Sequence, residues 1–357
     1  MPRPVRGAAS CSLQRVPAPI NLRSDTQTLP TPAMLQAIAT ADLGDDTYDE
    51  DPTVQRLEAM AAARMGMAAA LLVPSGHMGN LIALMVHAKP GDEVVLDRDS
   101  HIAYYEAGSM ASLAGLMPIP LVSVAGRLDP DEVAGAVRER DLHYATPRLL
   151  CLENTHNRSG GRVVPLTHHA ALCEVARAKG LAVHLDGARI FNAAIAQGCE
   201  VADYTRSVDS VMFCLSKGLS CPLGSLLVGS ATFIAEADRV RRRLGGGMRQ
   251  SGIIAAAGIV ALDSMVDRLA EDHARARRLA LGLASVDGLA IDLEAVETNM
   301  VMVDHSALPW TTHELLARWA AVGVLGSARA PRHIRLVTHR HHDDDVIDDA
   351  VSRIAGA

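Results

Sequence analysis

Only three side chains in this sequence can supply an amine nucleophile, because 31 of the 34 basic residues are arginine and three are lysine. Lys89 precedes a Pro-Gly turn signal, and Lys179 precedes a glycine where a helix is expected to end, a position that favours a cation. Lys217 has neither explanation. It follows the apolar run 208–215, which is typical of a buried strand, and an amine held there is suited to Schiff-base formation with an aldehyde.

A carboxylate ends a second apolar run, residues 181–185. Asp186 follows this run directly, and Gly187 then breaks the strand before Arg189. A carboxylate at the buried end of a strand needs a cationic or N–H partner, and a protonated pyridine nitrogen is one candidate. Taken alone, either this aspartate or the lysine would also fit a structural role.

A turn that could hold phosphate follows the apolar run 69–73. It contains Ser75, Gly76 and His77 and opens the expected helix 81–87, so free N–H groups and the helix dipole point at one spot. A lysine for an aldehyde, a carboxylate for a ring nitrogen and a cradle for phosphate are together the requirements of pyridoxal 5'-phosphate. The sequence therefore predicts this cofactor.

Short runs rich in Val and Leu alternate with stretches of helical periodicity from about residue 54 onward, which predicts an α/β fold with a mostly parallel sheet. In such sheets ligands bind at the carboxyl ends of the strands, where the three motifs lie. The predicted strands are residues 69–73, 93–96, 148–152, 182–185, 208–215 and 224–228.

Two units are expected behind a flexible leader, residues 1–20, in a chain of 357 residues. Residues 21–264 would form an N-terminal arm and a large cofactor-binding domain. Residues 265–357 would form a smaller α+β domain that contains the apolar runs 299–303 and 333–337. The segment 253–283 is interpreted as one long helix that bridges the two units.

The sequence resembles the threonine aldolases of the low-specificity L-threonine aldolase type, which are fold type I pyridoxal-phosphate enzymes typified by aspartate aminotransferase. The resemblance runs in order from about residue 20 to residue 354. The stretches that carry it are residues 21–26, 44–53, 152–157, 184–192, 214–219, 245–250, 298–300 and 334–338.

This resemblance implies an aspartate-aminotransferase-like large domain with a seven-stranded sheet. It also implies reversible retro-aldol cleavage of L-threonine, L-allo-threonine and related β-hydroxy-α-amino acids to glycine and an aldehyde. The assembly that it implies is a homotetramer, a dimer of dimers, with active sites shared across the dimer interface. Tyr48, expected at the substrate, and Arg249, expected at the cofactor, would reach a neighbouring subunit's site.

The resemblance also assigns roles to single residues. Lys217 would form the Schiff base and Asp186 would pair with the pyridine nitrogen, while Ser75, Gly76 and His77 would hold the cofactor's phosphate. Ser24, Arg189 and Arg335 would receive the substrate carboxylate, with Arg189 also beside the cofactor.

Two histidines are assigned in the same way. His101 would stack on the cofactor ring, and His156 would lie near the substrate hydroxyl. Either imidazole, or a water between them, could be the base that removes the hydroxyl proton. The sequence departs from the family at His77, where threonine is common, so a hydroxyl contact to phosphate is lost there and an imidazole could donate instead.

Composition excludes several other classes of function. The net charge of −7 argues against nucleic acid as a partner, and no apolar run approaches the length of a membrane span. Six cysteines without CxxC pairing fit a reducing cytoplasm. The run 338–345 is rich in His and Asp, but adjacent residues cannot all face one ion, so no metal site is expected.

Two alternatives remain open at this point. The first is another fold type I enzyme, an aminotransferase or a β-eliminating lyase, which needs the same lysine, aspartate and arginine. The second is a cofactor-binding protein without turnover. The stretch 153–156 and the two candidate histidines favour the aldolase over both.

Overall fold

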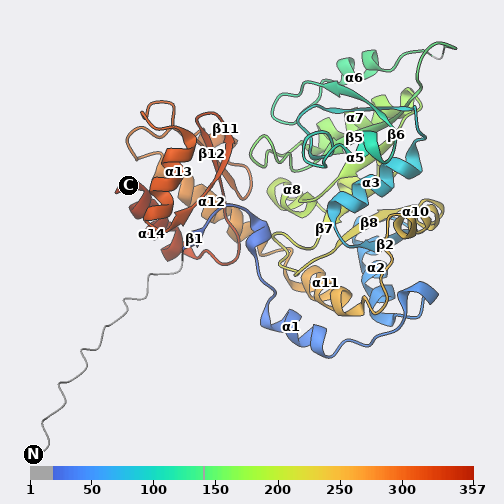
Figure 1. The fold of residues 1–357 in the computed structure, drawn as a ribbon, viewed down its shortest axis with the longest axis horizontal. Helices are drawn as coiled ribbons and strands as arrows, with labels where there is room; N and C mark the ends of the chain where they lie inside the picture. Colours follow the sequence, from blue (N-terminus) through green and yellow to red (C-terminus); the bar gives the residue numbers. More distant parts are fainter. Residues whose placement is uncertain (1–18, 140) are drawn as a thin grey trace, which may run out of the picture.

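The computed structural model describes residues 19–139 and 141–357, so nearly all of the predicted leader lies outside the described residues. Seven strands form one sheet in the order β2-β8-β7-β6-β5-β3-β4. This sheet and its helices form the right-hand part of Figure 1, and the C-terminal unit lies on the left. β8 is antiparallel to both neighbours, and every other pair in this sheet is parallel. This confirms the predicted α/β fold. The strands are β2 (Ala69–Val73), β3 (Glu93–Asp97), β4 (Met117–Leu121), β5 (Pro147–Glu153), β6 (Ala182–Asp186), β7 (Ser210–Cys214) and β8 (Ser225–Gly229).

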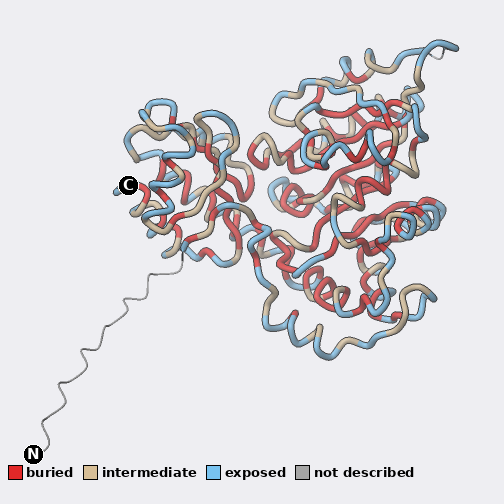
Figure 2. Tube along the Cα trace, in the orientation of Figure 1, coloured by how far each residue is buried: buried red, intermediate tan, exposed pale blue. Residues whose placement is uncertain are grey.

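Both faces of this sheet are buried, which is why its strands are continuous apolar runs. Successive residues of one strand belong to different cores: Leu72 and Val95 pack in the largest cluster, whereas Leu71 and Val94 pack in clusters on the other face. Figure 2 shows buried residues concentrated along these strands.

The helices that cover the sheet come mostly from the segments between strands. They are α1 (Pro32–Ala39), α2 (Pro52–Met65), α3 (Gly76–His87), α4 (His101–Tyr104), α5 (Ser109–Ser112), α6 (Pro130–Ala136), α7 (Leu166–Ala178), α8 (Ile190–Gln197), α9 (Val201–Thr205), α10 (Ala231–Arg243) and α11 (Gly252–Ser264). Two short 3-10 turns precede α1 and α2, namely η1 (Asp25–Gln27) and η2 (Asp46–Tyr48). None of the helices in the described part of the chain has the length and apolar character needed to cross a bilayer.

β4 lies at the edge of the sheet beside β3, and the sequence did not predict it. Pro118 and Pro120 interrupt its apolar pattern, and a proline cannot donate to a strand ladder. Only one side of an edge strand must pair, so two prolines are tolerated there.

A second core lies in the C-terminal unit, where an antiparallel sheet of order β11-β12-β9 packs on helices. Its elements are η3 (Leu293–Ala295), β9 (Met300–Asp304), α13 (Thr312–Ala321), β10 (Val324–Leu325), β11 (Ser327–Ala330), β12 (His333–Val337) and α14 (Asp344–Ala355). Ile20 and Leu22 also lie in this core, because β1 (Ile20–Asn21) pairs in parallel with β10. The sequence places residue 20 in the leader and residue 21 in the large domain, whereas the structure places both in a strand of the C-terminal unit.

The long helix expected over 253–283 is two helices, α11 and α12 (Leu269–Leu283), so that prediction was wrong. Met265 and Val266 lie between them and turn into the large core, where both are buried. α12 still spans the two units, because Leu269 packs in the large core and Leu279 packs in the small one.

The acidic residues that follow the His-rich run lie at a helix N-terminus. Asp343 caps α14 by accepting a hydrogen bond from the amide of Val346, and Asp344 and Asp345 occupy the first turn. Carboxylates are favoured at this end of the helix dipole. The acids therefore have a helix-stabilising role in the structure.

Candidate active site

Three carboxylates lie at the carboxyl ends of neighbouring parallel strands in the large sheet. Asp97 ends β3, Glu153 ends β5 and Asp186 ends β6, and Glu153 pairs in register with Asp186. All three are buried. Lys217 lies three residues beyond β7, so the topology brings the predicted lysine to the same edge. Buried acids gathered this way require donors or cations close by.

Asp186 is held in place by two donors. Its Oδ2 accepts from Asn80 Nδ2 at 2.9 Å and its Oδ1 accepts from the backbone N–H of Ala188 at 3.0 Å. Asn80 lies in the second turn of α3, and its Oδ1 is 3.1 Å from His184 Nε2. The helix that begins at the predicted phosphate turn therefore also orients the carboxylate predicted to face the ring nitrogen.

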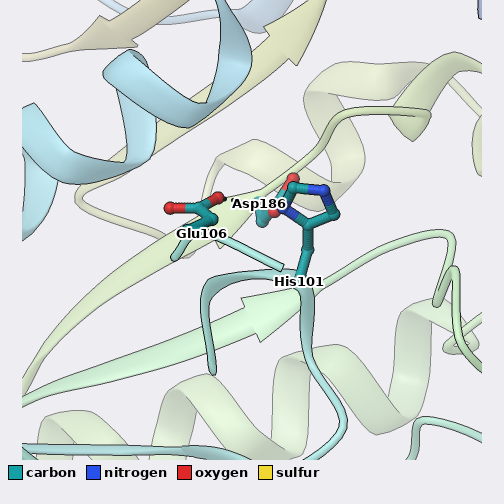
Figure 3. A group of neighbouring side chains, drawn as sticks. All are labelled: His101, Glu106 and Asp186. Atoms are coloured by element: carbon teal, nitrogen blue, oxygen red, sulfur yellow. Dashed lines mark hydrogen bonds and ion pairs between the residues drawn. The ribbon is translucent and has the colours of Figure 1, made fainter. Parts of the chain in front are cut away.

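His101 lies beside Asp186, held by a buried glutamate (Figure 3). His101 Nδ1 is 3.0 Å from Glu106 Oε1, and one ligand atom from each of His101, Glu106 and Asp186 falls within a 4.8 Å cluster. Burial alone lowers the pKa of His101, but the hydrogen bond that its imidazole donates to Glu106 and the charge of Asp186 outweigh burial and raise it. His101 Nε2 forms no hydrogen bond with any residue that the structure describes.

Glu106 is the central acceptor of this group. It is 1% exposed, and its Oε1 also accepts from Asn80 Nδ2 at 2.8 Å. Burial raises its pKa. Its Oε2 has no hydrogen-bond partner among the described residues and lies 3.8 Å from His77 Nε2.

The N-terminus of α3 has the features of a phosphate cradle. Ser75 is the N-cap, and its Oγ accepts from the amide of Met78 at 3.2 Å. A Cβ on Gly76 would lie 2.8 Å from Cys214 Sγ, so a larger residue here would have to displace side chains at the end of β7. His77, at the position where a threonine was expected, contacts Ser109 Oγ at 3.1 Å.

Lys217 is fixed through its backbone. Thr28 Oγ1, just after η1, donates to the Lys217 carbonyl at 2.8 Å. Within residues 19–139 and 141–357 no carboxylate forms an ion pair with its amine. Its charge acts on Asp25, whose pKa it helps to lower. The Lys217 side chain therefore has no ion-pair partner among the described residues, which keeps its amine available.

Arg189 forms a buried, bidentate ion pair with Asp25. Its Nε donates to Oδ2 at 2.7 Å and its Nη2 donates to Oδ1 at 2.6 Å. Burial alone raises the pKa of the Asp25 carboxyl, but the Arg189 guanidinium outweighs burial and holds that pKa well below its ordinary value. Asn299 Nδ2 also donates to Asp25, at 3.3 Å. Two of the three guanidinium nitrogens of Arg189 thus donate to Asp25, and Nη1 forms no hydrogen bond with any described residue.

Arg335 on β12 is the less neutralised of the two arginines. Its Nη1 donates to Asn157 Oδ1 at 2.6 Å and its Nη2 to the Arg23 carbonyl at 3.3 Å, and no carboxylate in the described residues pairs with it. Burial, with the charges of Arg189 and Arg329, lowers its pKa to about 10. A guanidinium in this state would bind an anion well.

Ser24 lies at the start of η1, beside Asp25. Its Oγ accepts from the amide of Thr26 at 3.2 Å and from Thr26 Oγ1 at 3.0 Å. The short segment 24–28 therefore contains Ser24, predicted to bind the substrate carboxylate. It also contains Asp25, which pairs with Arg189, and Thr28, which contacts the Lys217 carbonyl.

His156 is not placed as a free base. It is 1% exposed, its Nε2 lies 3.1 Å from Asp97 Oδ2, and its Nδ1 lies 2.7 Å from Ser159 Oγ. Burial lowers its pKa, but the charges of Glu153 and Asp97 outweigh burial and raise it. Nδ1 is hydrogen-bonded, and Nε2 faces the Asp97 carboxylate at ion-pair distance without a hydrogen-bond partner among the described residues. A buried imidazole that faces a carboxylate in this way favours a positioning role for His156, and His101 is the more exposed of the two imidazoles.

Tyr48 and Arg249 lie together on the surface. The side chains are 73% and 66% exposed, respectively, the Arg249 carbonyl accepts from the amide of Asp46 at 3.0 Å, and Arg249 Nη1 donates to Thr47 Oγ1. None of these contacts involves Lys217 or Asp186. Within one chain, the two residues are therefore not brought to the site.

Three residues that hold the site were not assigned from sequence: Asn80, Glu106 and Asp25. Asp25 lies inside the stretch 21–26 that carries the resemblance, next to Ser24, and Asn80 lies three residues after His77, beyond the turn predicted to hold phosphate. Glu106 follows two tyrosines five residues after His101, and no local pattern marks it.

Comparison with known proteins gives the family to which this chain belongs. The family model described as beta-eliminating lyase matches residues 21–306. The low specificity L-threonine aldolase of Escherichia coli (strain K12) is 46% identical over 285 residues, which cover 80% of this chain and 84% of that protein. The chain belongs to the beta-eliminating lyase family.

Solved structures give the fold of this beta-eliminating lyase family member independently. A threonine aldolase of Leishmania major superposes with a TM-score of 0.80 at 18% identity, covering 94% of this chain and 98% of that one. An aspartate aminotransferase double mutant of Thermus thermophilus superposes with a TM-score of 0.73 at 16% identity, covering 95% and 91%. The predicted aspartate-aminotransferase-like fold is confirmed.

Proposed function

We propose that this chain cleaves L-threonine, L-allo-threonine and related β-hydroxy-α-amino acids to glycine and an aldehyde, reversibly, with pyridoxal 5'-phosphate as cofactor. The observation that carries the proposal is the convergence of Lys217, Asp186 and the N-terminus of α3 at one sheet edge, in a chain whose curated relative is named as a threonine aldolase. The fold alone would not distinguish this activity from others.

The residues present fit the cofactor. The turn at Gly76 leaves room for the phosphate, and the buried Asp186 carboxylate is oriented to face the ring nitrogen. The Lys217 amine, which has no ion-pair partner among the described residues, suits the aldehyde. When bound, pyridoxal phosphate supplies an electron sink that makes a bond at the substrate Cα breakable. Ser75 and His77 would complete the phosphate cradle, and His101 would face the ring.

The substrate carboxylate is received by Arg335, whose positive charge is not neutralised by a carboxylate of the described chain. Arg189 contributes through Nη1, because Asp25 holds its other two nitrogens. Ser24 lies beside this pair and would donate its hydroxyl to the same carboxylate.

The β-hydroxyl proton passes to His101 Nε2, the imidazole nitrogen that Glu106 leaves free. Glu106 holds the ring orientation and stabilises the charge that the imidazole gains. His156, fixed between Asp97 and Ser159, forms the wall behind the hydroxyl rather than the base.

The assembly belongs to the proposal as well. A homotetramer, a dimer of dimers, would bring Tyr48 to the substrate and Arg249 to the cofactor of a neighbouring site, and the high exposure of both in one chain supports this arrangement. The five described cysteines are all unbridged, which supports a cytoplasmic location.

The test begins with the cofactor. The purified chain should bind pyridoxal phosphate with a visible absorbance band, and borohydride reduction with peptide mapping should find it on Lys217. Lys217→Ala should lose the band, whereas the matched controls Lys89→Ala and Lys179→Ala, both exposed lysines, should keep it. A cofactor attached to Lys89 or Lys179 would refute the site.

The reaction is tested next. L-threonine or L-allo-threonine should give equal amounts of glycine and acetaldehyde without any keto-acid acceptor. Steady pyruvate from alanine plus 2-oxoglutarate would show an aminotransferase instead, and pyruvate with ammonia from serine would show a β-eliminating lyase. Either result without aldehyde release would overturn the aldolase proposal.

A further inference from the structure

A cavity of about 290 Å³ is lined in part by His156, and none of Lys217, Asp186 and His101 lines it. Its wall includes Arg158 and Arg329, with the hydroxyls of Ser123 and Ser159. The size approaches the lower end of the range for small-ligand pockets. The cavity thus has charged and hydroxyl groups in part of its wall, and it shares His156 with the position proposed for the substrate hydroxyl.

The charges in this wall do not cancel. Arg158 is paired, because its Nε lies 2.9 Å from Asp99 Oδ1. Arg329 has no carboxylate partner among the described residues. Its Nη1 donates to the Tyr105 hydroxyl, its Nε donates to the Arg158 carbonyl at 3.5 Å, and its Nη2 is buried with no hydrogen-bond partner in that same part of the chain. The positive charge of Arg329 is therefore not neutralised by a carboxylate of the described residues.

Tyr105 lies between Arg329 and His101, the proposed base. The Tyr105 ring that Arg329 contacts lies 5.5 Å from the His101 ring, centroid to centroid. Arg329 lies on β11, the strand paired with the β12 strand that carries Arg335. The pKa of Arg335 is lowered partly by the charge of Arg329, so the two guanidiniums are close enough to act on each other. An anion between or beside them would relieve this repulsion.

Resting on the proposed function, we propose that the Arg329 cavity receives an anionic group on the substrate side chain. The substrate class then includes β-hydroxy-α-amino acids that carry a side-chain carboxylate, of which 3-hydroxyaspartate is the simplest. Arg335 binds the α-carboxylate and Arg329 binds the second carboxylate. The Cα–Cβ bond breaks, the hydroxyl proton leaves Cβ's oxygen and Cα gains a proton, so the products are glycine and glyoxylate.

The kinetic test compares two substrates of the same shape, 3-hydroxyaspartate and its neutral amide 3-hydroxyasparagine. Removing a charged hydrogen-bond partner should cost roughly 10- to 100-fold, so Arg329→Gln should lower kcat/KM for 3-hydroxyaspartate by that factor. The values for 3-hydroxyasparagine and threonine should change by less than about threefold. Arg329→Lys should recover part of the loss because it restores the charge.

Arg98→Gln is the matched control, because it removes one arginine charge close to the cavity from an exposed side chain that pairs with Asp99 at 3.6 Å. It should leave the ratio of the two substrates unchanged. If Arg329→Gln leaves this ratio unchanged while threonine is still cleaved, the cavity proposal fails and the aldolase proposal stands. Loss of all three activities without loss of folding would also count against a side-chain role for Arg329.

A binding measurement provides a readout that needs no turnover. Calorimetric titration of the full chain with succinate and with its monoamide, succinamate, separates the contribution of the second carboxylate. Succinate should bind at least tenfold more tightly than succinamate to the unchanged chain, and the two should bind alike to Arg329→Gln. Equal affinities in the unchanged chain would overturn the proposal.

Discussion

Replacing Asp25 by alanine would leave the Arg189 guanidinium buried without its counter-charge. Both side chains are almost fully buried, at 0% and 7% exposed, and two short hydrogen bonds join them. Removing one partner of such a pair typically costs about 3–5 kcal/mol of unfolding free energy, because the other charge is left desolvated. The hydrogen bond from Asn299 to Asp25 is lost with it, so we expect a loss towards the upper part of this range.

A double-mutant cycle separates this ion pair from other effects of each substitution. Arg189→Met alone should destabilise the protein for the same reason, since Asp25 then lacks its cation. The double variant should be less destabilised than the sum of the two, because both charges have gone together. Denaturant unfolding followed by circular dichroism measures all three.

The exposed pair Arg278 and Asp348 is the matched control, because it has the same bidentate geometry with hydrogen bonds of 2.7 and 2.6 Å. Solvent and salt screen that pair, so Asp348→Ala should change stability far less than Asp25→Ala. Additive effects of Asp25→Ala and Arg189→Met would refute the buried pair. They would instead favour an Arg189 that is free to bind the substrate carboxylate with its whole guanidinium.

The same ion pair gives stability a defined pH dependence. The pKa of Asp25 is lowered in the folded state, so its stabilisation is complete above its ordinary unfolded value near 3.8. It is lost as the pH falls below that value towards the folded pKa. Asp25→Asn should therefore be less sensitive to acid than the unchanged protein.

Two further predictions concern the network around the cofactor position. Glu106→Gln removes the charge that helps to raise the pKa of His101, so the imidazole stays neutral to lower pH. The acid limb of the pH–rate profile should therefore move to lower pH, and an unmoved limb would exclude His101 as the base. Gly76→Ala places a Cβ 2.8 Å from Cys214 Sγ and should weaken cofactor binding roughly tenfold or more, measured by fluorescence titration, whereas the exposed Gly135→Ala, with nothing within 4 Å, should bind normally.

The strands of the large sheet could be predicted because burial on both faces makes each one an unbroken apolar run. Residues 69–73 match β2 without a shift, and 333–337 match β12. β4 was missed because an exposed edge strand with Pro118 and Pro120 has neither an apolar run nor an alternating pattern. The break between α11 and α12 was missed because Met265 and Val266 are apolar and continue the helical pattern.

The candidate site was predictable where one residue type has a chemical requirement, as with Lys217 among three lysines. It was not predictable where a residue acts on a distant partner. Asp25 meets Arg189 across 164 positions of sequence and Glu106 meets Asn80 across 26. His156 was assigned a role through its motif, but only the fold shows that one ring nitrogen contacts Ser159 and the other faces the Asp97 carboxylate.

The parallel pairing of β1 with β10 bears on the order in which the molecule is completed during synthesis. Ile20 leaves the ribosome first, yet its partner Val324 follows only after nearly the whole chain has been made. The large sheet is finished at β8, well before β10 is available. The segment that carries Ser24, Asp25 and Thr28 follows β1 directly. Thr28 can contact Lys217 in the large domain early, but β1 can pair with β10 only when synthesis is almost complete. We therefore expect a nascent chain released shortly before residue 324 to have a folded large sheet but an Arg189 without its anchored carboxylate partner.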